Sequence, residues 1–465
     1  MTAAPRALAL LCACAASSGA GAAELARSDD GSRLVEASGF VKPYAGWLLL
    51  PPELVAATAE LERALDEARA LVPPEYRAEL PDGVTLPEHV GISTWTGRVQ
   101  GKATLLGSLE LEAAWQAALV LSTSSSVGAG APQMGVLGGS SAEPARRLID
   151  FDAAIVDEGG LRVLHNLDRL LLRWQTPDFA LTVGRQALSW GAGRLWNPTD
   201  LVSPFSPTDV DREVRRGADA VRLSLPLGAL SQMELLWLPR QELDEQGVVV
   251  RAQTNLWQTD LSGSAAKYVD DLVLGADLAG DLGPLGVHGE VAWTIPARHP
   301  QRDHFARAVA GLDWRPFDEL VLGAEYYWNG FGSDDKDEIV ARLTDVRAQR
   351  GEVFGAGRHY VGLVASWLPG ELLTVNATAI VNASDTSVLL VPALEYWLEQ
   401  SVLLRAGAFV PYGLGVDVAR FEALGGDDVL GRSAAFDHAL RTLEAQSEHG
   451  LTPAGVFVQV GAYVP

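Results

Sequence analysis

Apolar and polar side chains alternate with a period of two residues over much of the chain. In residues 319–329 the even positions are all apolar or aromatic: Leu320, Leu322, Ala324, Tyr326 and Trp328. The odd positions include the carboxylate of Glu325. Because a β-strand sends successive side chains to opposite faces, this segment has one apolar face that ends in an aromatic ring and one face with a charge. The unit recurs along most of the chain, which is typical of a transmembrane β-barrel.

The alternation predicts an all-β fold, a closed antiparallel transmembrane barrel of about 16 strands, with roughly 14 to 18 as the range. The predicted strands cover residues 38–49, 98–106, 109–121, 166–175, 179–190, 217–227, 230–238, 271–281, 285–295, 305–315, 319–329, 358–368, 371–383, 387–398, 401–409 and 455–464. Tight turns alternate with long connections, which include 122–165, 191–216, 239–269, 330–357 and 410–454. The short link 384–386 breaks this alternation. Short periplasmic turns and long external loops are the pattern of outer-membrane barrels.

Seven tryptophans lie near the ends of predicted strands, some before tight turns and some before long loops. They are Trp174, Trp314, Trp367 and Trp397 on the turn side and Trp237, Trp293 and Trp328 on the loop side. Amphipathic rings prefer the membrane–water interface, so we expect these residues to form an aromatic girdle at two levels.

If the apolar positions face lipid, their alternates face the lumen and include many charged side chains. The lumen and constriction set is Arg173, Arg185, Arg194, Arg222, Glu234, Asp277, Glu290, Arg307, Asp313 and Glu325. Basic residues dominate early strands and acidic residues dominate middle strands, which predicts opposite walls of unlike sign across a pore. Cross-strand ion pairs that fill a closed lumen are the alternative.

The segment 184–222 differs from the other connections because arginine, aspartate, proline and tryptophan are concentrated in it. Prolines reduce the entropy lost when a loop holds one path. We therefore expect residues 191–216 to fold into the lumen or to cap it.

This segment also carries a resemblance. The run Gly184-Arg185-Gln186, Ser189-Trp190-Gly191, Gly193-Arg194 and Asn197-Pro198-x-Asp200-Leu201 resembles bacterial outer-membrane porin-like proteins, and its Gly-Arg-Gln strand end is similar to barrels of the alginate-export type. The resemblance implies an outer-membrane location and the barrel-assembly machinery as a partner. Such barrels usually end in an aromatic residue, whereas Tyr463 is followed here by Val464 and Pro465.

The first residues have the pattern of an export signal. Arg6 precedes an apolar stretch, and the small residues up to Ala23 suit cleavage, so residues 1–23 are predicted to be a signal peptide and 24–465 the barrel. Both cysteines, Cys12 and Cys14, fall inside this signal, and lipidation at Cys14 stays open as an alternative. Residues 51–74 interrupt the alternation with an amphipathic helical insert between proline pairs, either a surface helix or a plug over the lumen.

The remaining composition narrows the function. A net charge of −23 argues against nucleic-acid binding. No zinc motif, phosphate-binding glycine loop or nucleophile elbow occurs, so we expect no metal, no cofactor and no catalytic residues.

The sequence therefore predicts a porin-like channel for passive diffusion of small polar or charged solutes, surrounded by outer-membrane lipid. Two alternatives remain: a non-conducting structural, adhesive or assembly barrel and, more remotely, a surface enzyme. A homo-oligomer is also left open.

Overall fold

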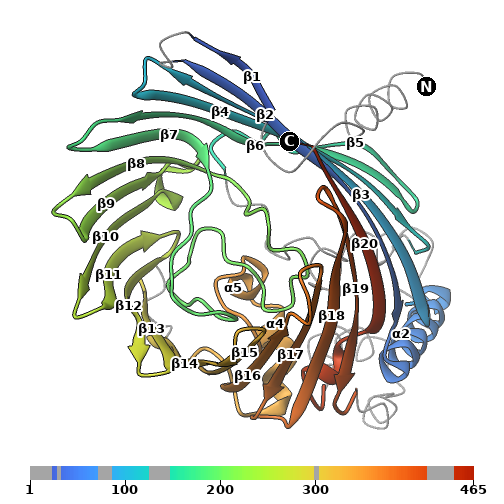
Figure 1. Cartoon of the computed structure of the whole chain (residues 1–465). Coiled ribbons are helices and arrows are strands. Elements are labelled where there is room, and N and C mark those ends of the chain that lie inside the picture. The colour runs from blue at the N-terminus through green and yellow to red at the C-terminus, as the bar shows by residue number, and fades with distance from the viewer. Residues whose placement is uncertain are drawn as a thin grey trace.

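In the computed structural model, the strands form one antiparallel sheet that curves round and closes on itself (Figure 1). The structure describes residues 23–28, 33–71, 86–124, 147–297, 303–415 and 445–464. Residues 1–22 of the predicted signal peptide, including Cys14, and residues 72–74 of the predicted insert lie outside these ranges.

The strands follow one another round the wall in chain order. They are β1 Ala23–Arg27, β2 Leu34–Leu49, β3 His89–Leu105, β4 Leu109–Ser122, β5 Ala153–Glu158, β6 Leu161–Gln175, β7 Ala180–Gln186, β8 Ala218–Pro226, β9 Ser231–Leu238, β10 Gly247–Leu256, β11 Thr259–Tyr268, β12 Asp271–Leu282, β13 Leu285–Pro296, β14 Phe305–Phe317, β15 Leu320–Asn329, β16 His359–Trp367, β17 Leu373–Asn382, β18 Ser387–Glu399, β19 Val402–Tyr412 and β20 Ala454–Val464. The helical pieces are α2 Pro52–Leu71, η3 Leu243–Glu245, η4 Lys336–Glu338, α4 Ile339–Leu343, α5 Val346–Gln349 and η5 His449–Leu451.

The first long strand and the last strand close the ring. β2 pairs with β20 from Gly39 opposite Val464 to Leu49 opposite Ala454, and with β3 along its other edge. Within the described residues, 18 of the 20 strands make the closed barrel. The other two are short: β1 adds to the turn-side end of β2, and β5 adds to the loop-side end of β6.

The expected class of closed antiparallel barrel is confirmed, but the expectation of about 16 strands is wrong. The segment 239–269, predicted as a long loop, contains the paired strands β10 and β11. Their turn consists of Trp257 and Gln258, both with positive φ, at 51° and 64°. Hairpin turns with positive φ usually use asparagine or glycine, so this turn carries none of the residues that mark one in a sequence. The alternation of Val248, Val250 and Ala252 with Arg251 was the signal available for β10.

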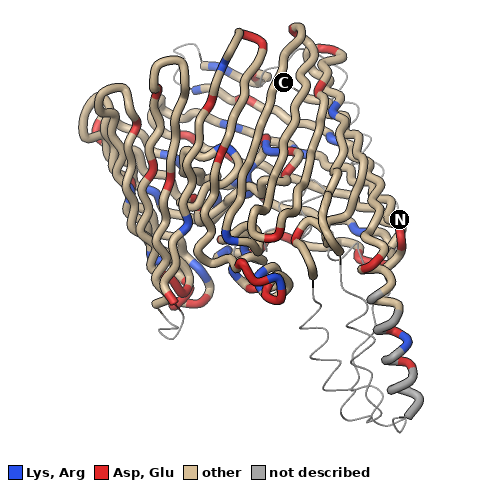
Figure 2. Tube along the Cα trace, turned by 90° about the horizontal axis from the view of Figure 1, so that it is seen from below, with Lys and Arg blue, Asp and Glu red and all other residues tan. Residues whose placement is uncertain are grey.

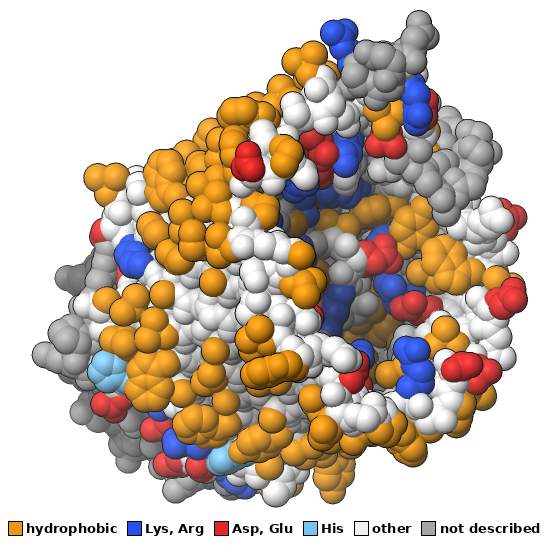
Figure 3. Space-filling model, turned by 60° about the vertical axis from the view of Figure 1, so that its left-hand side comes forward, with side chains coloured by type: hydrophobic (Ala, Val, Ile, Leu, Met, Phe, Trp, Pro, Cys, Tyr) orange, Lys and Arg blue, Asp and Glu red, His pale blue; other side chains and the backbone are white. Residues whose placement is uncertain are grey.

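The outer surface of the barrel is apolar over a wide band. Figure 3 shows hydrophobic side chains spread across the outside, beside a hollow lined by charged groups. Leu274, Leu312, Leu363 and Val458 are each more than 40% exposed on this surface. In water, so large an apolar surface would be unfavourable, whereas lipid covers it without loss.

The helix α2 follows β2 directly at the loop end of the barrel. It projects away from the rim rather than into the ring (Figures 1 and 2). Near its start, Val55 packs against the buried side chains of that end. The described residues of α2 therefore lie outside the ring of strands. Among the described residues, no helix is long and apolar enough to cross a membrane.

Candidate functional site: the lumen and its inner loop

Residues 187–217, between β7 and β8, form a long connection that runs inside the barrel (Figure 1). We call this segment the inner loop. It contacts the wall through hydrogen bonds, apolar packing and ion pairs, which together decide how much of the lumen is left open.

Two wall carboxylates hold the first arm of the inner loop by its backbone. Glu290 on β13 accepts hydrogen bonds from the N–H groups of Ala192 at 2.5 Å, Gly193 at 2.8 Å and Thr199 at 3.2 Å. Glu325 on β15 accepts from the N–H groups of Arg194, Leu195, at 2.9 Å, and Trp196, at 3.4 Å. Both carboxylates are buried, so the backbone N–H groups replace the water that these charges would otherwise need.

The glycines of this arm allow the close approach. Gly191 has a φ of 97°, and a Cβ atom at this position would lie 2.4 Å from Oε1 of Glu290. A side chain would therefore collide with the carboxylate and also strain the backbone. The local sequence Trp190-Gly191-Ala192-Gly193 thus suits a chain that wraps round a carboxylate.

Apolar side chains of the inner loop fill two parts of the lumen. Leu195 and Trp196 join a buried cluster in the loop-side half of the barrel, where the Trp196 ring stacks on Tyr327 with centroids 5.3 Å apart. Leu188 and Trp190 belong to a second buried cluster against β8 to β13. The inner loop is therefore packed like a protein core against much of the wall.

The second arm of the inner loop crosses to the seam where β2 meets β20. Lys42 on β2 lies 2.8 Å from Asp211 and 2.7 Å from Glu213. Glu213 also accepts a hydrogen bond from the hydroxyl of Tyr463 on β20 at 2.7 Å and lies 3.5 Å from Arg405 on β19. We call these five residues the seam clamp, because they join the inner loop to the first and last strands at once.

An internal ion pair joins the two arms. Arg215 donates to the carboxylate of Asp200 and to the carbonyl of Ser203, the latter at 2.7 Å. The side chain of Asp200 is fully buried, and burial raises its pKa to about 6, against the opposing effect of Arg215.

Arginines on β3 and β6 form a basic group on the wall near the end of the inner loop. Arg98 and Arg169 share the carboxylate of Asp168, at 2.5 Å and 2.6 Å. Asp168 also accepts from the N–H of Gly217 at 2.9 Å, so the same carboxylate fixes the loop end.

Most of the lumen residues predicted from sequence are paired with close neighbours. Arg185 binds Asp219 at 2.8 Å, and Arg222 binds Glu234. Asp277 lies 3.4 Å from Arg251, a residue of the strand that the sequence prediction missed.

Three further predicted residues differ in their access to water. Arg307 is buried and donates to the carbonyl of Glu352. The side chain of Arg173 is 39% exposed, and that of Arg194 is 46% exposed although it lies 2.5 Å from Asp313.

These contacts correct the prediction of opposed walls. Arg194 pairs with Asp313 directly, so it cannot face the acidic wall from across a pore. Glu290 and Glu325 bind the inner loop instead of standing free. The reason is that buried carboxylates require donors, and the loop backbone supplies them where the sequence pattern showed only unpaired acids.

Six of the seven tryptophans named for the girdle lie on the outward parity of their strands. Trp174, Trp237, Trp293, Trp314 and Trp367 are each 45–47% exposed, and Trp328 is half-buried. Trp397 is different, because it shares the inward parity of Glu395 and packs 6.0 Å from the Tyr463 ring at the wall of a cavity. Its assignment to the girdle is therefore wrong, and the charge of Glu395 two residues earlier was the signal against it.

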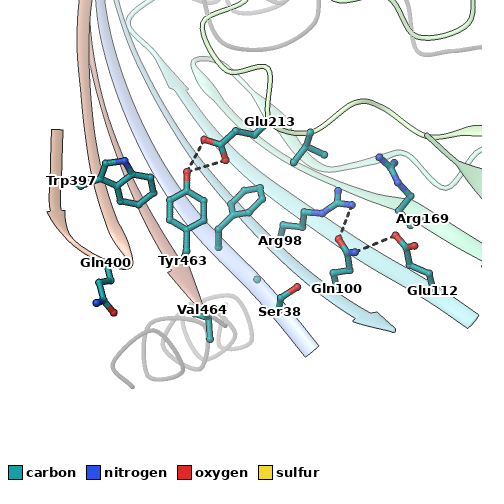
Figure 4. Close-up of a pocket in the computed structure, with 13 residues that line it drawn as sticks. Ser38, Arg98, Gln100, Glu112, Arg169, Glu213, Trp397, Gln400, Tyr463 and Val464 are labelled. Carbon is teal, nitrogen blue, oxygen red and sulfur yellow. Dashed lines mark hydrogen bonds between the residues drawn. The ribbon is translucent and has the colours of Figure 1, made fainter. Parts of the chain in front are cut away.

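A cavity of about 520 Å³ opens at the turn-side end of the lumen (Figure 4). Phe40, Trp397 and Tyr463 line one side, and Arg98, Gln100, Glu112 and Arg169 line the other. The period-two pattern puts Arg98, Gln100, Glu112 and Arg169 on the lumen side, but it did not assign the aromatic residues Phe40, Trp397 and Tyr463 to the lumen. Among the described residues, no group of three histidine, cysteine, aspartate or glutamate side chains could hold a metal ion.

Comparisons with known proteins place the fold. No protein-family profile matches the sequence, and no curated protein is similar to it. The solved structure of Pseudomonas aeruginosa OccK9 (OpdG) is similar over 93% of this chain and 98% of its own, with a TM-score of 0.52 and 13% identity. Pseudomonas aeruginosa OccD3 (OpdP) covers 96% of this chain and 94% of its own, with a TM-score of 0.48 and 7% identity. Acinetobacter baumannii OccAB1 covers 96% and 99%, with a TM-score of 0.48 and 8% identity.

The similarity to OccK9 concerns the fold and extends over nearly the whole of both chains. The prediction of a closed β-barrel with a porin-like fold is confirmed.

Proposed function

We propose that this barrel is a porin-like channel through which small polar or charged solutes diffuse passively. The observation that carries the proposal is the access of water to charged groups inside the ring. The side chains of Lys102, Arg173 and Arg194 are 41%, 39% and 46% exposed, although they belong to the inward parity or to the inner loop. A lumen filled by cross-strand ion pairs would bury them.

The inner loop is the constriction in this proposal. Its first arm occupies the space beside β13 and β15, and its second arm reaches the seam clamp on the opposite side. The path for solutes runs past the inner loop, along the wall that carries Arg98 and Arg173.

A non-conducting barrel is the second candidate, and one observation favours it. The cluster that includes Leu48, Trp196, Tyr327, Tyr360 and Phe409 fills part of the loop-side half of the lumen. If this packing spans the whole cross-section, the open turn-side half is a vestibule rather than a channel.

Single-channel recording separates the two candidates. The mature chain, refolded and shown to give a heat-modifiable band, is added to a planar bilayer. A channel gives discrete current steps that scale with salt concentration, and the reversal potential in a salt gradient gives the sign of its selectivity. A correctly folded barrel that gives no steps would support the non-conducting structure.

A further inference from the structure

The cavity at the turn-side end of the lumen combines an aromatic wall with a polar wall (Figure 4). Phe40, Tyr463 and Trp397 come from three strands, β2, β20 and β18, and their rings form a row. The Tyr463 centroid lies 6.2 Å from that of Phe40 and 6.0 Å from that of Trp397. All three side chains are half-buried. Nζ of Lys42 lies 4.5 Å from the centroid of the Phe40 ring and 5.6 Å from that of Tyr463, so the Trp397 ring is the one we assign to a solute.

The charged groups of the polar wall are already paired within the protein. Arg98 and Arg169 both bind Asp168. Glu112 accepts a hydrogen bond from Gln100 at 3.2 Å. Glu213, at the upper edge of the cavity, is held by Lys42 and by the hydroxyl of Tyr463.

The lining is also balanced in charge. Two arginines and two glutamates face the cavity, and its other polar groups include the neutral side chains of Ser38, Gln100, Gln400 and Tyr463. A simple anion or cation would compete with ion pairs that exist already. A neutral solute with many hydroxyl groups would instead use the lone pairs and N–H groups that remain on the same side chains.

We propose that this cavity is a binding subsite for neutral polyhydroxylated solutes, such as a mono- or disaccharide. The apolar C–H face of a sugar ring stacks on Trp397, beside the tilted rings of Tyr463 and Phe40, and its hydroxyl groups face Gln100 and Glu112. The volume of about 520 Å³ falls within the roughly 300–1,000 Å³ typical of small-molecule sites. The inference rests on the proposed function, because the solute would meet this subsite on its way through the turn-side half of the lumen.

Binding and conduction are tested separately, with maltose as the probe. Equilibrium dialysis of labelled maltose against the refolded full chain in detergent measures binding without any need for current. We expect saturable binding, and about tenfold weaker binding in Trp397→Ala, because a stacking ring is lost. Trp367→Ala removes an equally large ring from the outer surface and should bind like the wild type. Gln100→Leu is a second variant, which loses hydrogen bonds at the opposite wall and should also bind more weakly.

In the bilayer, maltose should reduce the ion current of the wild type in a saturable manner and that of Trp397→Ala only at higher concentration. Steady current with no maltose binding in dialysis would overturn the subsite and leave the channel. Saturable binding without current would overturn the channel and retain the cavity as a sugar site. Saturable block by choline chloride or sodium acetate in place of maltose would overturn the assignment to neutral solutes.

Discussion

The residues that shape the lumen act through pairing rather than through free charge. Arg194 keeps a water-exposed guanidinium only 2.5 Å from Asp313, and Glu325 binds three successive backbone N–H groups. The electrostatic potential inside the barrel therefore depends on local ion pairs. A substitution of one partner leaves the charge of the other partner uncompensated.

Arg194→Glu should shift ion selectivity toward cations. The new carboxylate would stand beside Asp313, so two negative charges would replace an ion pair at a site open to water. The reversal potential in a potassium chloride gradient measures the shift, and Arg194→Lys, which keeps the charge, is the control. A reversal potential that is equal in both variants would show that solutes do not pass this position.

The buried Glu352, between β15 and β16, gives a pH-dependent contribution to stability. Burial raises the pKa of its carboxyl to about 7 from an ordinary value of 4.5, against the opposing effect of Arg350. A carboxyl with a raised folded-state pKa stabilises the fold most when protonated, so this contribution is complete at low pH. It is lost as the pH rises from about 4.5 to about 7.

Glu352→Gln should therefore strengthen local stability at pH 8 and leave it unchanged at pH 4. Amide hydrogen exchange of α5 and residues 351–358 reports the local opening free energy. The exposed Glu338→Gln is the control, because that carboxylate pairs with Arg342 at 2.6 Å and its removal should not slow exchange at pH 8. Faster exchange in Glu352→Gln at pH 8 would contradict the prediction that the charged form of Glu352 destabilises this segment.

At the scale of elements, the period-two pattern predicted the strands of the barrel wall well, but it did not predict which residues fill the lumen. The strand prediction for 319–329 matches β15, because lipid on one side and polar groups on the other impose a strict alternation. The partner of Glu290 could not be read in this way, since Gly193 lies 97 positions earlier in the chain. Similarly, Tyr327 and Tyr360 point inward without carrying a charge, because Trp196 of the inner loop packs against both rings.

The anchoring of the inner loop can be tested by removing both wall carboxylates. The double variant Glu290→Ala/Glu325→Ala leaves the loop N–H groups without acceptors, each of which costs about 1–3 kcal/mol when buried. We expect the loop to leave the wall and the single-channel conductance to rise. Glu319→Ala, at an exposed turn on the outside, should conduct like the wild type. Unchanged conductance in a folded double variant would show that apolar packing alone positions the loop.

The β10–β11 turn holds two non-glycine residues at positive φ, so a glycine there should increase the stability of the barrel. Gln258 has a φ of 64°, which glycine adopts without steric cost. Gln258→Gly should therefore stabilise the barrel by about 1 kcal/mol or less, measured from reversible urea unfolding in lipid vesicles. Gln400→Gly changes the same residue type at a turn without positive φ and should give no gain. A loss of stability in Gln258→Gly would contradict this prediction, because it would mean that contacts of the glutamine side chain stabilise the fold by more than the positive φ costs.

At the scale of the whole molecule, the apolar outer surface requires lipid. Leu363 lies at the middle of β16 and is 48% exposed on this surface, whereas Leu368 lies just beyond the turn-side end of the strand. Leu363→Arg should cost about 2–4 kcal/mol of folding free energy in a bilayer, and Leu368→Arg about 0–1 kcal/mol, because the cost of a charge falls toward the interface. Guanidinium titration in vesicles measures both. Equal costs at the two positions would argue that this surface does not face the hydrocarbon core.

The seam clamp links the order of assembly to the shape of the pore. Lys42, Arg405 and Tyr463 come from strands at opposite ends of the chain, and they meet Glu213 only after β2 and β20 have paired. The inner loop has its full set of attachments only in a finished ring. A wall with its last strand still unpaired has the anchors on β13 and β15 but lacks the seam clamp, so the second arm of the inner loop takes its final position only when the barrel closes.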